Sequence, residues 1–225
     1  MSHGKQFTLY GDAGGPNPWK VVLVLTELGL TYESIFLNIS KQEQKSPEYL
    51  KLNPNGRVPA IIDHENDNFV LWESNAILLY LVDRYDKDHK LSAATDAEKA
   101  IQNQWLFFQA SGQGPYFGQF FWFNRYHSEK VPSAIERYYK ETERVYSVLN
   151  DVLTKQEWLV GDKITIADIS FITWNKAAFN SILGPDYHVE EKFPAVYKWN
   201  NAMTSRPAIK LVSEIQAEVR KNAAH

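Results

Sequence analysis

Residues 7–37 read FTLYGDAGGPNPWKVVLVLTELGLTYESIFL, and the order of patterns in this stretch decides the fold. A short strand is expected over residues 7–10, followed by a loop that begins at Gly11. A helix with a broad apolar face then begins at Asn17, the predicted N-cap, and ends at Gly29. A second strand covers residues 32–37. A strand, a helix and a strand in this order predict a parallel pair joined by a right-handed crossover.

The next segment adds two helices and a pair of strands to this unit. Ser46 and Pro47 open a short helix. Residues 58–63 and 69–72 are strand-like and are separated by a short polar loop, which predicts an antiparallel hairpin. Ser74 is the predicted N-cap of a helix over residues 75–85. The order β-α-β-α-β-β-α predicts a thioredoxin-like domain over residues 1–86.

The rest of the chain carries helical patterns. Residues 86–95 are polar and aperiodic, which is typical of a linker. An all-helical bundle domain is expected over residues 96–225, and Thr165 and Asp168 form a capping box before one of its helices. The fold class is therefore α/β plus all-α. The expected helices are 96–127 (weakened around 112–115), 132–154, 166–183, 195–204 and 208–222.

Composition excludes several classes of function. The chain has 24 basic and 27 acidic side chains and no long basic run, so a nucleic-acid partner is not expected. It has no cysteine, which excludes disulfides and a cysteine nucleophile. The histidines lack metal-ligand spacing, so no metal is expected. No apolar run is long enough to span a membrane and the first ten residues lack a signal core, which favours a cytoplasmic protein.

Two pairs of residues are candidates for binding a peptide-like molecule. If the Val58–Pro59 bond is cis, the main chain of Val58 can pair with an extended peptide. Pro59 also fits the simple start of an edge strand, and alone it favours that interpretation. Ser74 at a helix N-terminus suits a carboxylate, and Glu73 beside it suits an ammonium group. The alternative is an ordinary cap next to a solvated charge.

Asn17 is the candidate for contact with a sulfur atom. A thiol at the start of the first helix would feel the positive end of the helix dipole, and the Asn17 amide could donate a hydrogen bond to it. Both effects favour the thiolate. Simple capping ahead of Pro18 is an equally good explanation for Asn17, and the two roles are compatible.

Three motifs together resemble the cytosolic glutathione transferase family. They are LNPNGRVPA at 52–60, WESNAILLYL at 72–81 and TIAD at 165–168, in that order and at the family's spacing. The resemblance spans about Phe7 to Leu211. Within the family, the chain resembles the branch that contains the fungal nitrogen-regulator and prion protein and the bacterial nu-class enzymes. The signals for this branch are Pro16–Asn17, Glu43–Gln44, residues 112–115 and residues 134–138.

The resemblance implies a set of residues that bind glutathione. Val58 would pair with the cysteinyl main chain, and Glu73 and Ser74 would hold the γ-glutamyl end. Gln44 and Arg57 would contact the glycyl side, Arg137 would approach the site, and Asn17 would face the sulfur. The chain departs from better-known classes because residues 11–19 contain no Ser, Thr, Tyr or Cys. Tyr10 remains a rival activator, although its place in the strand favours a packing role.

The leading hypothesis is a glutathione transferase that uses the glutathione thiolate on disulfides, peroxides or other electrophiles. The resemblance favours disulfide reduction or peroxidase activity over aryl conjugation, and it implies a homodimer. Most of the dense aromatic side chains between Trp105 and Tyr126 are expected in a core, with some lining a pocket for a small hydrophobic or disulfide co-substrate. The alternatives are a non-catalytic glutathione-binding regulator or ligand carrier, and a domain of a larger assembly. The second alternative predicts basic or linker extensions, which the sequence lacks.

Overall fold

A computed structural model describes residues 4–223. The chain forms two compact units. One combines the chain up to Lys90 with the chain from Arg206 onward, and the other is Leu91–Ser205. The α/β plus all-α fold class is confirmed. The predicted ranges 1–86 and 96–225 placed the last helix in the helical domain, whereas the structure groups it with the sheet.

The first unit is built on a four-stranded sheet in the order β2-β1-β3-β4. Its strands are β1 (Phe7–Gly11), β2 (Tyr32–Phe36), β3 (Ala60–Asp63) and β4 (Phe69–Trp72). β1 and β2 are parallel, as the strand-helix-strand pattern predicted, and β3 and β4 form the predicted antiparallel hairpin. β1 and β3 are also antiparallel and join the two halves of the sheet.

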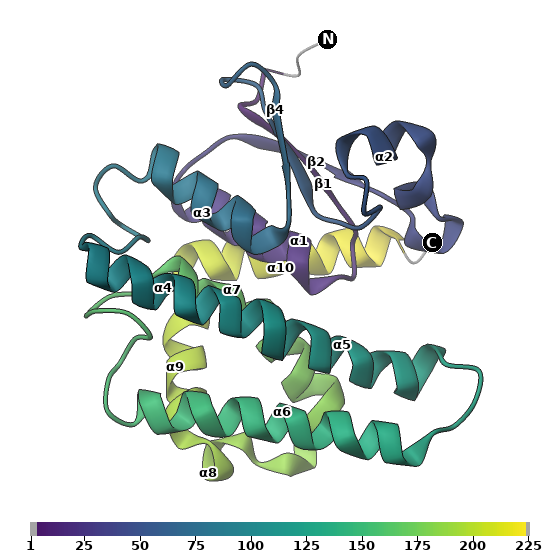
Figure 1. The fold of residues 1–225 in the computed structure, drawn as a ribbon, viewed down its shortest axis with the longest axis vertical. Helices are drawn as coiled ribbons and strands as arrows, with labels where there is room; N and C mark the ends of the chain where they lie inside the picture. The colour runs from purple at the N-terminus through teal and green to yellow at the C-terminus, as the bar shows by residue number, and fades with distance from the viewer. Residues whose placement is uncertain (1–3, 224–225) are drawn as a thin grey trace. The chain divides into compact units, whose positions relative to one another are not determined.

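Helices cover both faces of this sheet. They are α1 (Pro16–Glu27), α2 (Pro47–Leu52), α3 (Ser74–Tyr85) and α10 (Pro207–Ala223), with two 3₁₀ turns at Ile39–Lys41 and Glu43–Lys45. Figure 1 shows α1 and α3 on one side of the strands and α2 on the other. α10 packs against α1, so α1 lies inside the unit and not at its surface.

The burial of α1 explains why the C-terminal helix belongs to this unit. Every residue of the run Val21–Leu25 is buried, and a helix that is apolar on all sides needs cover beyond one sheet face. α10 supplies that cover. Its entry is fixed by Arg206, whose guanidinium donates two hydrogen bonds to the Glu27 carboxylate at 2.7 and 2.8 Å. This bidentate pair is the stronger kind of ion pair.

The second unit contains helices joined by loops, with no strand within residues 91–205. Its helices are α4 (Asp96–Phe108), α5 (Gly114–Phe121), α6 (Pro132–Leu153), α7 (Ile166–Ala178), α8 (Val189–Lys192) and α9 (Pro194–Thr204). Three π-helical segments lie between them, at Gln109–Gln113, Trp122–Tyr126 and Phe179–Leu183. The first coincides with the predicted weak point of the 96–127 pattern.

α7 is the central helix of this unit and packs against α4 and α9. The predicted capping box at its start is confirmed. The buried Asp168 carboxylate accepts hydrogen bonds from the main chain of Leu159 and Thr165, and from the indole of Trp199 at 2.9 Å. Burial raises the pKa of Asp168, and these hydrogen bonds oppose the shift. Among the helices of residues 4–223, none combines the length and apolarity that a membrane crossing requires.

Candidate functional site

Three strands come to the same end of the sheet. Tyr10 at the end of β1 pairs with Ala60 at the start of β3, and Ala60 pairs with Trp72 at the end of β4. The segments that follow β1, precede β3 and follow β4 therefore emerge side by side. They carry Asn17, Val58, Glu73 and Ser74, which we call the strand-end site. Four of the seven predicted site residues thus lie on segments that leave the same end of the sheet.

Asn17 lies in the first turn of α1 and is half-buried. The prediction that it is the N-cap was wrong, because α1 begins at Pro16 and Gly15 is the N-cap. The reason is Asp12, whose carboxylate accepts hydrogen bonds from the Gly14 and Gly15 amides at 3.1 and 2.7 Å. The Asp12 carboxylate thus accepts hydrogen bonds from the main-chain amides just before the helix, and Asn17 lies inside the first turn instead of capping it.

The loop before α1 is also held from the other end of the chain. The Arg220 guanidinium on α10 donates to the carbonyls of Ala13 and Gly14 at 3.1 and 2.8 Å. The Trp19 indole donates to the same Ala13 carbonyl at 3.2 Å. These bonds fix the approach to α1 and thereby the position of Asn17.

The segment around Val58 is anchored through its neighbour. The Val58–Pro59 peptide is cis. The Arg57 carbonyl accepts hydrogen bonds from the Tyr49 hydroxyl at 2.7 Å and from the Asn53 amide at 2.6 Å. Burial, opposed by the Asn53 bond, raises the pKa of Tyr49 to about 12, so Tyr49 keeps its proton and remains a donor near neutral pH. The Arg57 side chain is exposed.

Glu73 and Ser74 form the junction between β4 and α3. Glu73 is the N-cap with a left-handed φ of 69°, and Ser74 is the first helical residue, so the prediction of Ser74 as the cap was wrong by one position. A left-handed non-glycine residue is uncommon and costs on the order of 1 kcal/mol or more. The left-handed turn at Glu73 leaves Ser74 at the N-terminus of α3, where a helix favours a bound anion.

The structure adds Lys20 and Asn75, two residues that the sequence interpretation did not assign to the site. Lys20 on α1 is 1% exposed, and its ammonium lies 2.7 Å from the Asn75 side-chain oxygen on α3. Burial lowers the pKa of Lys20 to about 7, and the nearby Glu73 carboxylate partly opposes this shift. The signal was present in the sequence, since Lys20 interrupts a run that is otherwise apolar from Trp19 to Leu25.

Gln44 lies beside the turn that precedes Arg57. Gly56 in this turn has a φ of +59°, and a β-carbon there would lie 2.9 Å from the Gln44 carbonyl. The Gln44 side-chain oxygen is buried, and no described residue donates a hydrogen bond to it. A buried acceptor of this kind needs a donor. Gln44 and Arg57 therefore flank one turn of the first unit.

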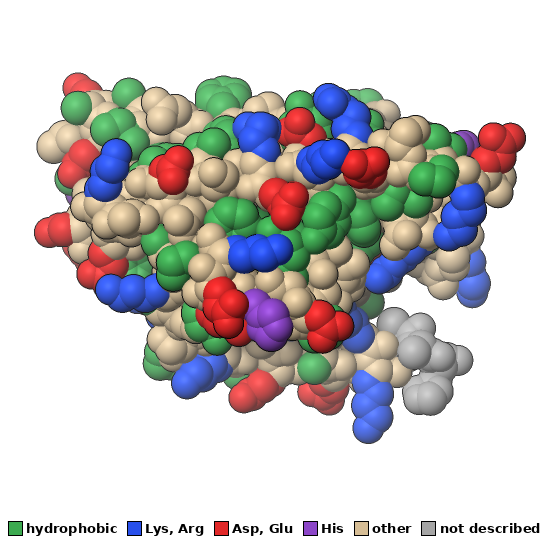
Figure 2. All heavy atoms as spheres, turned by 90° about the horizontal axis from the view of Figure 1, so that it is seen from below, with side chains coloured by type: hydrophobic (Ala, Val, Ile, Leu, Met, Phe, Trp, Pro, Cys, Tyr) green, Lys and Arg blue, Asp and Glu red, His purple; other side chains and the backbone are tan. Residues whose placement is uncertain are grey.

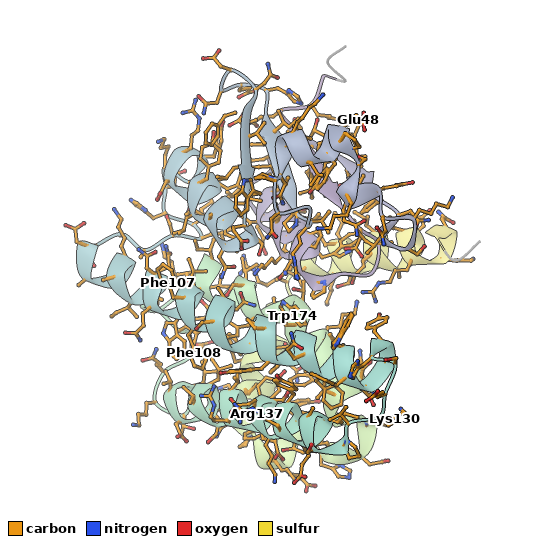
Figure 3. All side chains as sticks on the ribbon, turned by 45° about the vertical axis from the view of Figure 1, so that its right-hand side comes forward. Glu48, Phe107, Phe108, Lys130, Arg137 and Trp174 are labelled. Carbon is orange, nitrogen blue, oxygen red and sulfur yellow. The ribbon has the colours of Figure 1, made fainter. Side chains whose placement is uncertain are left out.

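The remaining sequence predictions concern Arg137, Tyr10 and the aromatic segment. Arg137 is exposed on α6 of the helical unit, as Figure 3 shows, and its approach to glutathione stays a prediction. Tyr10 is half-buried with its ring centre 5.6 Å from that of Tyr49, which fits the predicted packing role. The aromatic segment is mixed: Trp105, Phe117 and Phe120 are buried, whereas Phe107, Trp122 and Tyr126 are exposed.

Charge is dispersed on the face of the molecule in Figure 2, where acidic and basic side chains alternate with hydrophobic ones. Within residues 4–223, no group of three or more histidine or acidic side chains is placed to hold a metal ion.

Comparison with known proteins identifies the family. Residues 5–83 match the family model for the glutathione S-transferase N-terminal domain, and residues 112–207 match the C-terminal domain. Glutathione S-transferase 2 of Schizosaccharomyces pombe is 49% identical over 98% of this chain and 99% of its own length.

Solved structures agree with this assignment. The glutathione transferase URE2P6 from Phanerochaete chrysosporium, solved with oxidized glutathione, has a TM-score of 0.95 and 60% identity over 97% of this chain and 100% of that one. Ure2p5 from the same organism, cocrystallized with 1-(S-glutathionyl)-2,4-dinitrobenzene, has a TM-score of 0.89 and 50% identity over 98% of both chains. The chain belongs to the glutathione S-transferase family, and it is similar to the Ure2-like fungal members of that family.

Proposed function

We propose that this glutathione transferase binds glutathione at the strand-end site and uses its thiolate mainly on disulfides and peroxides. One observation carries the proposal: the sheet register places the start of α1, the segment before β3 and the start of α3 at the same end of the sheet. An extended tripeptide bound there has the main chain of Val58 beside its middle residue. At one end it has the Glu73 carboxylate and the N-terminus of α3, and Asn17 lies near its sulfur.

The tripeptide is held by complementary chemistry along its length. The main chain of Val58, which precedes the first paired residue of β3, forms strand-like hydrogen bonds with the cysteinyl residue. Glu73 binds the γ-glutamyl ammonium, and Ser74 at the start of α3 binds the adjacent carboxylate. Charge-assisted bonds of this kind contribute about 1.5 to 3 kcal/mol each. At the glycyl side, the Gln44 oxygen accepts an amide hydrogen, and Arg57 attracts the carboxylate.

Asn17 acts on the sulfur without taking its proton. An amide cannot serve as a general base at neutral pH, so its role is to donate a hydrogen bond to the thiolate. The dipole of α1 acts in the same direction. Each unit by which the thiol pKa falls corresponds to about 1.4 kcal/mol of thiolate stabilisation.

The thiolate then attacks one sulfur of a disulfide. A new sulfur–sulfur bond forms, the original one breaks, and the displaced thiolate takes up a proton. A second glutathione attacks the resulting mixed disulfide and releases oxidised glutathione and the second thiol. With an organic peroxide, two glutathione molecules supply the two electrons, and the products are oxidised glutathione, an alcohol and water. Binding of oxidized glutathione by URE2P6 supports this preference.

The co-substrate site and the assembly complete the proposal. Some of the aromatic rings between Trp105 and Tyr126 contact the co-substrate, while the buried ones belong to the core of the helical unit. The functional protein is a homodimer in the cytoplasm. The complex of Ure2p5 with a dinitrophenyl conjugate supports aryl conjugation as a secondary activity.

Replacing Asn17 by alanine tests the proposed chemistry. We expect turnover with a mixed disulfide of glutathione and mercaptoethanol to fall about 10- to 100-fold, because one charge-assisted hydrogen bond to the thiolate is lost. The dissociation constant for glutathione, measured by calorimetry, should change much less. Absorbance of the thiolate across a pH series should show a higher thiol pKa for glutathione bound to the variant.

Tyr10→Phe is the matched control, since it removes the hydroxyl of the rival activator. Its turnover should match that of the unaltered protein. Loss of turnover in Tyr10→Phe together with unchanged turnover in Asn17→Ala would transfer the role to Tyr10. The same assays with an organic hydroperoxide and a chlorinated dinitrobenzene rank the three reactions. If the dinitrobenzene is the best substrate, the proposed preference for disulfides and peroxides is wrong.

A further inference from the structure

Lys20 has an unusual position for a lysine. Among residues 4–223 it is the only lysine or arginine in the buried class, and it lies on α1 between Trp19 and Val21, which are buried as well. Burying an ammonium group is unfavourable unless it is paired and hydrogen-bonded. A methionine of similar length would fill the space without that cost. A lysine at this position therefore indicates a specific role for its charge and its hydrogen-bond donors.

The ammonium of Lys20 is directed at the junction between β4 and α3. It donates to the Asn75 side-chain oxygen at 2.7 Å and interacts electrostatically with the Glu73 carboxylate. Lys20 therefore bonds to one neighbour of Ser74 and interacts electrostatically with the other. We call Glu73, Ser74 and Asn75 the recognition segment, because the first two are the residues assigned to the γ-glutamyl end of glutathione.

The recognition segment needs such an anchor. Its first residue, Glu73, has a left-handed backbone with a φ of 69°, a conformation that a glutamate does not favour by itself. Strained residues of this kind persist where the surrounding structure holds them. A hydrogen bond from a buried, packed side chain in a low-dielectric interior is well suited to hold them.

The geometry points to Lys20 as a positioning residue for γ-glutamyl recognition: its buried ammonium holds the recognition segment in the conformation that binds the zwitterionic end of glutathione. This inference rests on the proposed function. Lys20 acts through Glu73, Ser74 and Asn75, and it needs no contact with the ligand. Its effect should accordingly be confined to ligands that carry a γ-glutamyl group.

A pair of ligands separates this role from a general structural one. S-hexylglutathione carries all three residues of the tripeptide, and S-hexylcysteinylglycine lacks only the γ-glutamyl group. We expect Lys20→Met to weaken binding of S-hexylglutathione about tenfold or more, and to change binding of S-hexylcysteinylglycine less than about twofold, as measured by calorimetry. In steady-state assays the KM for glutathione should rise while kcat at saturation is largely kept.

Two further variants complete the experiment. Lys51→Met, which removes an exposed lysine on α2, is the matched control and should bind both ligands as the unaltered protein does. Asn75→Ala removes the acceptor but keeps the lysine, and should show the same selective loss. If circular dichroism shows that Lys20→Met does not fold, Asn75→Ala decides the matter.

The outcomes distinguish this inference from the proposal beneath it. Equal losses for both ligands, or no loss in Lys20→Met and Asn75→Ala, would overturn the positioning role while leaving glutathione binding in place. If the unaltered protein fails to bind S-hexylglutathione, the proposed function is itself wrong and the role of Lys20 falls with it.

Discussion

Replacing Lys20 by methionine should make the free energy of unfolding less dependent on pH. Burial lowers the pKa of Lys20 from 10.5 to about 7 in the folded chain, despite the opposing Glu73 carboxylate. Because the folded-state pKa lies below the unfolded-state value, the charged lysine penalises the folded state fully below about pH 7. The penalty fades as the pH rises toward the unfolded-state value of 10.5. Native stability should therefore increase with pH over this window.

The size of the effect follows from the two pKa values. A pKa of about 7 in the folded state and 10.5 in the unfolded state gives about 3 kcal/mol of added stability between about pH 6 and pH 9.5. A folded-state pKa one unit higher gives about 2 kcal/mol over the same interval. Other groups also titrate in this range, but they do so in both proteins. The difference between native and variant isolates the contribution of Lys20.

Urea unfolding at a series of pH values measures this difference. We expect the native protein to gain about 2 to 3 kcal/mol relative to Lys20→Met between the two ends of the pH range. The m-value should be the same for both proteins, which shows that the surface exposed on unfolding is unchanged. A difference that stays constant across the range would contradict the burial of a titrating ammonium at this position.

Two other substitutions test the supports of the fold and of the site. Asp168→Ala leaves the buried donors of Leu159, Thr165 and Trp199 without their acceptor, so urea unfolding should show a loss of about 3 to 5 kcal/mol; a loss below about 1 kcal/mol would refute the importance of this network. Gly56→Ala places a β-carbon 2.9 Å from the Gln44 carbonyl at a left-handed position, and should weaken glutathione binding several-fold in calorimetry. Unchanged glutathione affinity in Gly56→Ala would show that Gln44 is not part of the binding site.

Local patterns predicted the secondary structure of the first unit well. The apolar run of α1, the polar loop between β3 and β4, and the capping box at Thr165 are determined by neighbours in sequence, and all three are confirmed. Helix starts were less predictable. The Asp12 carboxylate accepts hydrogen bonds from the Gly14 and Gly15 amides just before α1, and the helix starts at Pro16.

Features that depend on distant contacts were not predictable from the same patterns. The amphipathic pattern of α10 indicates a helix but does not say which unit it covers, and its contact with α1 through Arg206 and Glu27 joins residues far apart in the chain. The Lys20–Asn75 bond is of the same kind, since it links α1 to α3. For the site, the sheet register could be expected from the hairpin and the crossover. Lys20 stands out within an apolar run of the sequence, but its partner Asn75 on another helix could not be predicted.

A crystal structure of the protein with S-hexylglutathione would locate the bound tripeptide directly. We expect the γ-glutamyl ammonium to contact Glu73, its carboxylate to lie at the start of α3 beside Ser74, and the cysteinyl main chain to pair with Val58. The sulfur should lie within hydrogen-bonding distance of the Asn17 side chain. A ligand bound away from this end of the sheet, or one bound there with its sulfur turned away from Asn17, would contradict this expectation.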